Sequence, residues 1–217
     1  MTLEEITILL ASWSDYMWIL VAVISLFTIR RNRYFWILSV YLFLIAPLYI
    51  ETSITADYEL NNNKIYYIIG FIELVFTFWL YRNLGFKHIW NWIFMIVVSI
   101  YTIDLVYNLI QDEEEINSIG QSVNMLFIIL LGFNFIWKLY QEEKVEYLGF
   151  YPYFYISGGL TIFASGAFFG YLFIARMTPE TTPAESFFYL WIIISGFNYI
   201  KFILIVLGIF VERKYAK

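Results

Sequence analysis

FFYLWIIISGFNYIKFILIVLGIFV, residues 187–211, is the stretch that decides the fold. It carries a single charged residue, Lys201, near its middle. A helix needs about 20 mainly apolar residues to cross the ~30 Å hydrocarbon core of a bilayer. The run is continuous, whereas a barrel strand alternates over ~10 residues, so the stretch predicts a membrane-spanning helix.

Six more stretches of similar length and hydropathy precede this one. Spans are expected near residues 8–29, 34–54, 65–84, 89–110, 119–140, 153–175 and 187–211. They occupy almost all of the 217 residues, which leaves no room for a soluble catalytic domain. The predicted fold is therefore an all-α, polytopic integral membrane protein, with residues 1–217 forming one seven-helix transmembrane domain.

The composition supports this class. Hydrophobic residues make up 61% and charged residues 14%, against roughly 45–50% and about 25% in soluble domains. The mean hydropathy is +0.70. A net charge of −5 disfavours nucleic acid as a partner, because phosphates would be repelled. With no cysteine and one histidine, the chain lacks the residues of most zinc sites, and no metal site is expected.

Basic residues predict the orientation. The N-terminus and the loops after spans two, four and six carry two of the 13 Lys and Arg residues, and Lys201 lies inside a span. The remaining ten lie in the loops after spans one, three and five and in the tail. Because Lys and Arg stay in the cytoplasm, the N-terminus is expected outside and the C-terminus inside. The acidic start lacks the basic region of a cleaved signal, so span one should remain in the mature protein.

A few ionisable residues lie inside the spans, namely Asp15, Glu73, Asp104 and Lys201. Charge in hydrocarbon is costly, so such residues are candidates for a ligand or ion site. At ~1.5 Å per residue, Asp15 and Glu73 lie roughly 12–14 Å below the outer surface and the Lys201 Cα roughly 21 Å. Helix side chains lean toward the N-terminus, which lifts the Lys201 ammonium by about 6 Å. An ion pair of Lys201 with Glu73 or Asp15 is therefore predicted.

Polar residues also recur at helical spacing beside these charges. Asn198 shares a face with Lys201, and Asn108 shares one with Asp104. Such faces either line a polar cavity open to the outside or hold the helices together by hydrogen bonds. The candidate ligand- or ion-binding residues are Asp15, Glu73, Asp104, Asn108, Asn198 and Lys201.

Span six is rich in small residues. Gly159, Ser165, Gly166 and Gly170 are expected to form a helix-packing face, because small side chains let two helices approach closely.

A seventh span with a lysine halfway along resembles the retinal-binding microbial rhodopsins. That resemblance implies retinal bound to Lys201, with Glu73 as its counter-ion. Span six lacks the Trp-x-x-Tyr-Pro element of that family. The topology also resembles that of the SWEET sugar transporters, which repeat three parallel helices; here a Gly-Phe step at Gly70 is echoed at Gly196.

FYISGGLTIFASGA, residues 154–167, resembles a motif of uncharacterised bacterial seven-helix membrane proteins, FWINSGLLIYFSGN. Trp191 and Asn198 match that family's pattern in span seven. The resemblance implies a multi-pass protein of the bacterial cytoplasmic (inner) membrane, with a membrane sensor kinase or a second copy as its partner. The same span is similar to the lysoplasmalogenase-like membrane family, which implies a lipid-acting enzyme.

Four hypotheses for function follow. The favoured one is a sensory or accessory protein, not an enzyme, that binds a small or lipid-like ligand in a polar cavity between helices. The alternatives are a transporter or proton or ion pathway that uses the buried Asp, Glu and Lys residues, a lipid-acting enzyme, and a retinal photoreceptor. The lipid bilayer is the expected partner in all four.

Overall fold

The structure, a computed structural model, describes residues 2–26, 33–58, 63–111, 118–141, 148–174 and 184–215. The described chain is helical and contains no strand. Its elements are α1 (Leu3–Ser25), α2 (Arg33–Asp57), α3 (Asn63–Asn83), α4 (Ile89–Gln111), α5 (Ser118–Gln141), the 3-10 turn η1 (Leu148–Phe150), α6 (Pro152–Ile174) and α7 (Ala184–Tyr215).

Seven of the described helices are long and apolar enough to cross a membrane. Their bounds agree with the expected spans to within a few residues; residues 27–29 and 175 of those spans lie outside the described residues. The largest difference is the early start of α1. Thr2 caps this helix, because its hydroxyl accepts from the Glu5 N–H at 3.2 Å and its own N–H donates to Glu5 Oε2 at 2.9 Å.

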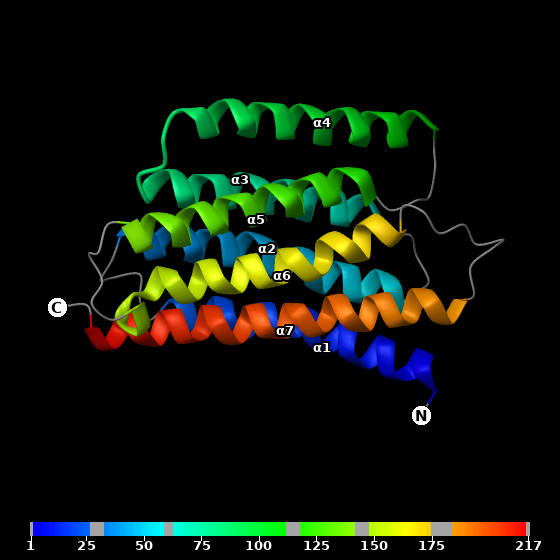
Figure 1. Cartoon of the computed structure of the whole chain (residues 1–217). Helices are drawn as coiled ribbons and strands as arrows, with labels where there is room; N and C mark the ends of the chain where they lie inside the picture. Colours follow the sequence, from blue (N-terminus) through cyan, green and yellow to red (C-terminus); the bar gives the residue numbers. More distant parts are fainter. Residues whose placement is uncertain are drawn as a thin grey trace.

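Six of these helices form a closed ring in the order α1, α2, α3, α5, α6, α7, with α7 returning to α1. Helix α4 lies outside this ring and packs on α3 and α5 (Figure 1). The halves α1–α3 and α5–α7 follow the same order around the ring. Helices α3 and α7 therefore hold corresponding places and face each other across the interior.

The ring has two ends. The N-end is the end at which α1 begins, and the C-end is the end at which α7 finishes (Figure 1).

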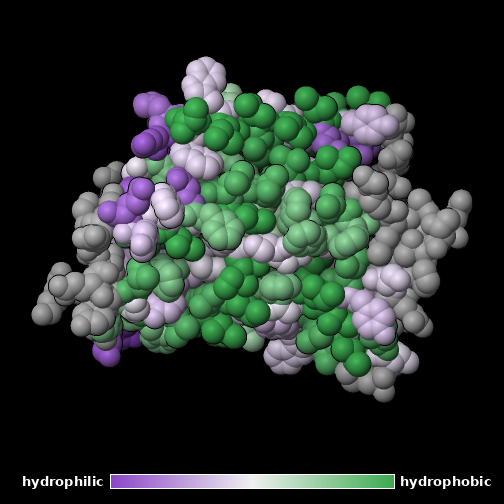
Figure 2. Space-filling view, viewed as in Figure 1, coloured by the Kyte–Doolittle hydropathy of each residue, from purple (hydrophilic) through white to green (hydrophobic). Residues whose placement is uncertain are grey.

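The outside of the bundle is apolar. Figure 2 shows hydrophobic residues over most of the middle of one face and hydrophilic residues nearer its ends. On α4, large apolar side chains stand almost free, with Trp92 exposed by 73% and Ile110 by 75%. Water would penalise this surface, whereas lipid would not. The seven helices are thus compatible with a multi-pass integral membrane protein.

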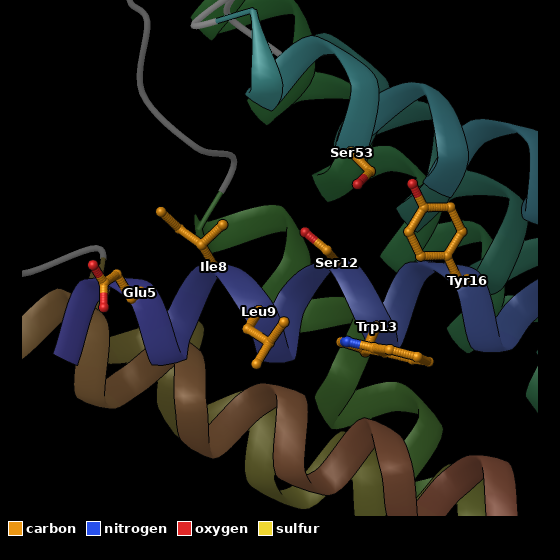
Figure 3. A pocket seen from close by; sticks show the side chains of 7 residues that line it. All are labelled: Glu5, Ile8, Leu9, Ser12, Trp13, Tyr16 and Ser53. Atoms are coloured by element: carbon orange, nitrogen blue, oxygen red, sulfur yellow. The ribbon is translucent and has the colours of Figure 1, made fainter. Parts of the chain in front are cut away.

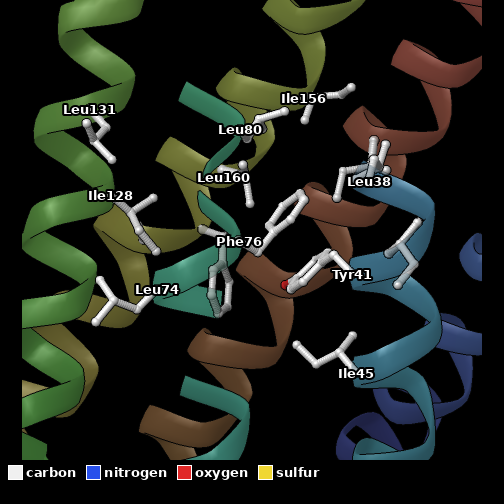
Figure 4. Close-up of a cluster of buried hydrophobic side chains, with 14 of the residues drawn as sticks. Leu38, Tyr41, Ile45, Leu74, Phe76, Leu80, Ile128, Leu131, Ile156 and Leu160 are labelled. Carbon is white, nitrogen blue, oxygen red and sulfur yellow. The ribbon is translucent and has the colours of Figure 1, made fainter. Parts of the chain in front are cut away.

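The interior of the ring toward the C-end is filled by aliphatic and aromatic side chains. Leu38, Leu80, Ile156 and Leu160 come together there from three helices (Figure 4), and all are at most 2% exposed. This packing closes the ring at the C-end, and a small number of hydroxyl groups lie within it.

The small residues of α6 pack against α7. A Cβ atom added to Gly166 would overlap the Phe197 ring, and one added to Gly170 would lie 2.6 Å from Ile194. Gly159 faces the backbone of Lys201, whose carbonyl oxygen would lie 3.2 Å from an added Cβ. Ser165 instead turns its hydroxyl to the Thr161 carbonyl of its own helix, at 2.8 Å. The close seam fixes the position of α7 and hence of Lys201.

Gly166→Ala is expected to destabilise the bundle by about 1–3 kcal/mol, because the added methyl group would clash with the Phe197 ring and displace it. Gly158→Ala is the matched control on the same helix, since nothing lies within 4 Å of its added Cβ. Thermal unfolding of both variants in lipid nanodiscs measures the difference. Equal melting temperatures for the two variants would contradict the seam.

Candidate functional site

A buried ion pair crosses the middle of the ring. Lys201 on α7 places Nζ 3.4 Å from Oε1 of Glu73 on α3, and the two side chains are 0% and 3% exposed. The Tyr41 hydroxyl on α2 donates to the same carboxylate oxygen at 3.4 Å. Of the two partners expected for Lys201, the structure supplies Glu73. The pair joins the two opposite helices of the ring.

Aromatic rings enclose the lysine. Its Nζ lies 3.4 Å from the centroid of Phe163 on α6 and 4.7 Å from that of Trp18 on α1. Each such contact is worth about 2 kcal/mol or more where water is excluded. Trp18 is itself held in place by stacking on Tyr49, with 5.0 Å between the ring centroids. The cage therefore offsets part of the cost of burying the charge.

A small polar cavity of about 50 Å³ lies on the N-end side of this pair. Helices α1, α2, α3, α6 and α7 contribute to its wall. The residues are Ser14, Asp15, Tyr49, Tyr66, Phe163, Tyr171, Trp191, Ile194, Ser195 and Asn198. The volume suits a few water-sized groups, since each needs roughly 10–15 Å³ of cavity.

The cavity presents hydrogen-bond acceptors. Asn198 donates its Nδ2 to the Ser14 hydroxyl at 2.6 Å, which joins α7 to α1. The amide oxygen of Asn198, Oδ1, is buried and has no hydrogen-bond partner among the described residues. Asp15 is 8% exposed and interacts with the Thr52 side chain of α2. A carboxylate and an unsatisfied amide oxygen thus face a space without any basic residue on its wall.

Phe163 separates this cavity from Lys201, because it lines the cavity and also contacts Lys201 Nζ. Lys201 is therefore enclosed by its partner and by aromatic rings rather than by open space. Sites that enclose organic ligands measure ~300–1,000 Å³, against about 50 Å³ here. In this conformation the described side chains leave no room for retinal on Lys201.

Two candidates from the sequence lie elsewhere. Asp104 on α4 is half-buried and accepts from the Gly120 N–H at 2.9 Å, near the start of α5. A carboxylate is stabilised there by the partial positive charge of the helix N-terminus. Asn108, one turn further along α4, is also half-buried. Neither residue lines the cavity, because α4 stands outside the ring.

The polar residues of α5 hold it to α3. Gln121 Nε2 donates to the Tyr66 carbonyl at 3.0 Å, and Asn124 Nδ2 donates to the Gly70 carbonyl at 3.1 Å. These hydrogen bonds between neutral groups satisfy amide nitrogens that have no access to water, and they hold the two helices together. The polar faces thus divide into interhelical bonds around α5 and a cavity between α1 and α7.

A second hollow lies on the surface between α1 and α2. Its volume is about 730 Å³, and it is open to the outside. Figure 3 shows Ser12 and Tyr16 directed from α1 toward Ser53 of α2, while Trp13 points away. It lies on the apolar exterior, where lipid would fill it, and Asp15 is not among its lining residues.

Sequence reasoning missed the aromatic cage. Trp18, Tyr41 and Phe163 surround the pair, but 23% of the chain is aromatic, so no local signal distinguishes these rings. Among the residues that the structure describes, no cluster of three or more His, Asp or Glu side chains is placed to hold a metal ion.

Lys201→Met is expected to destabilise the bundle by about 3–5 kcal/mol, because it leaves Glu73 charged, buried and unpaired. Adding Glu73→Gln to this variant should restore part of the loss. The interaction energy of this double-mutant cycle should then exceed about 1 kcal/mol. Unfolding by denaturant in lipid or detergent measures all four proteins.

Lys64→Met, at an exposed position in the first turn of α3, is the control and should change little. Additive single effects, with no rescue in the double variant, would show that the two side chains do not interact.

Comparison of the chain with protein-family models, with curated proteins and with solved structures finds no match. The resemblance of span six to bacterial seven-helix proteins therefore stays a prediction from its motif.

Proposed function

We propose that the protein is a sensory or accessory membrane protein that binds a small monovalent cation, of the size of ammonium, in the N-end cavity. The observation that carries this proposal is the pair of acceptors on the cavity wall, the Asp15 carboxylate and the unpartnered Asn198 Oδ1. Aromatic faces complete the wall and also attract cations.

The charge of the site supports a cation of charge +1. Glu73 and Lys201 compensate each other, so an ionised Asp15 would leave one negative charge on the cavity wall. Divalent cations such as Ca²⁺ require six to eight oxygen ligands, commonly from several carboxylates. A single carboxylate in about 50 Å³ fits ammonium or an alkali-metal ion better.

The distribution of basic residues supports an outward-facing cavity. The N-end would face the outside if Lys and Arg remain cytoplasmic. The cavity would then sample the medium beyond the bacterial cytoplasmic membrane. Because Asn198 and Ser14 join α7 to α1 at its wall, a bound cation would alter the contact between these helices. A sensor kinase or a second copy of the chain would read that change at the membrane.

A lipid-acting enzyme receives less support from this arrangement. Such an enzyme needs an acid and a base that converge on one substrate. Asp15, Asp104 and the Glu73–Lys201 pair lie in three separate places. The pair nevertheless has buried hydroxyl groups near it, on Thr77 and Tyr81, that favour an ion pathway.

Ammonium chloride is expected to raise the melting temperature of the wild-type protein in nanodiscs, because the ligand binds only the folded state. Asp15→Asn should abolish this shift, since the amide removes the negative charge. Asp104→Asn is the matched control and should keep the shift, because its amide oxygen can still accept from Gly120.

Tetramethylammonium chloride at equal ionic strength controls for salt and tests size, because this ion is too bulky for the cavity. A shift of the same size with tetramethylammonium, or a full ammonium shift in Asp15→Asn, would overturn the proposed site.

A further inference from the structure

We infer that the ring holds a proton path, formed by hydroxyl groups that lead from Glu73 to the C-end. The N-end cavity is its entrance on the other side of Glu73. The inference goes beyond cation binding and does not depend on it, because Asp15 is not a member of the path. Its members come from α3 and α6 and are buried in the ring interior.

Thr77 is the most informative member. It lies one helical turn beyond Glu73 on α3 and is fully buried, and its hydroxyl has no hydrogen-bond partner among the described residues. Other buried and exposed hydroxyls here bond the carbonyl four residues earlier, as Thr161 and Thr102 do at 2.8 Å. Thr77 Oγ1 therefore takes no part in the hydrogen bonds that join the described helices, and it can exchange a hydrogen bond with water.

Tyr81 follows one turn after Thr77 on the same face of α3. Its hydroxyl lies 2.6 Å from the Ser157 hydroxyl, which reaches across the ring from α6. Successive members are spaced by ~6 Å along the helix axis, and the tyrosine side chain leans back toward Thr77. A water molecule beside Thr77 would bridge this spacing by hydrogen bonds.

Helix α6 continues the path to the C-end. Tyr153 precedes Ser157 by one turn and lies in the first turn of α6. It is buried and packs edge-on against the half-buried Tyr151, with 5.5 Å between ring centroids. Its position brings the path to the beginning of the helix, at the C-end of the ring.

On the N-end side of Glu73, two tyrosines lie near both the carboxylate and the cavity. Tyr49 and Tyr171 line the cavity and also lie within electrostatic range of Glu73. Other ionisable groups around this carboxylate are Lys201 on α7, Tyr41 on α2 and Tyr101 on α4. Helix α5 faces it with neutral amides, and α1 with the Trp18 ring that packs over Lys201.

Each transfer along this path is balanced. A hydroxyl or water oxygen accepts one proton and releases its own to the next oxygen, so that no covalent bond other than O–H changes. Glu73 takes a proton on its carboxylate and gives one up on its other side, while Lys201 holds the charge in place. The aliphatic side chains at the C-end keep bulk water away, so the hydroxyls are the polar route through them.

Proton flux into proteoliposomes, driven by a potassium diffusion potential and reported by an internal pH dye, tests the path. Wild-type protein should exceed empty liposomes. Thr77→Val should lower the flux by about tenfold or more, and Glu73→Gln should do the same. Thr102→Val is the matched control and should keep full flux, because that hydroxyl is exposed on α4 and bonded within its helix.

Thr77→Ser restores the hydroxyl and should restore flux, which separates a proton relay from a packing defect. Wild-type flux equal to that of empty liposomes, or Thr77→Val flux equal to that of the wild type, would overturn the inference. The ammonium-induced stabilisation is measured on the same variants. It should persist in Thr77→Val, so failure of the path and failure of the cation site are distinguishable.

Discussion

The Glu73–Lys201 pair is the interaction on which the rest of the structure depends. A charge without a partner in a water-free interior costs several kcal/mol. The helices α3 and α7 must therefore face each other across the ring, so that Lys201 and Glu73 meet in its interior. Gly159 lets α6 approach α7 at the level of Lys201, and Phe163 of α6 then covers the ammonium group. The small residues of α6 thus help to keep the Lys201 charge buried, because they allow α6 to pack closely against α7.

Polar groups inside the ring join helices by hydrogen bonds, and some of them keep an unsatisfied atom. Around α5, the Gln121 and Asn124 amide nitrogens bond to backbone carbonyls of α3 and hold the two helices together, although Asn124 Oδ1 has no partner among the described residues. Between α1 and α7, Asn198 keeps an unsatisfied oxygen beside Asp15, and below the ion pair Thr77 keeps an unsatisfied hydroxyl. These unsatisfied groups lie on either side of the pair. They point to ligands of the simplest kind, a small cation on one side and water or a proton on the other.

The sequence alone predicted the helices and an ion pair of Lys201 with either Glu73 or Asp15, and the structure selects Glu73. Long apolar runs give the spans, and the depth of Lys201 together with the lean of helix side chains brings it near Glu73. It was insufficient for the place of α4. This helix is as apolar as its neighbours, yet 11% of its span is buried against 56% for α3, because contacts with distant helices decide which of them close the ring. Asp104 and Asn108 therefore looked equivalent to Asp15 in the sequence and lie outside the site in the structure.

The most direct test is a structure determined in lipid nanodiscs at side-chain resolution, with rubidium as an electron-dense substitute for ammonium. The account predicts Lys201 Nζ facing Glu73 across the ring, at about the 3.4 Å found here, with ion density between Asp15 and Asn198. A Lys201 side chain turned toward the lipid headgroups, together with an empty or collapsed cavity, would contradict it.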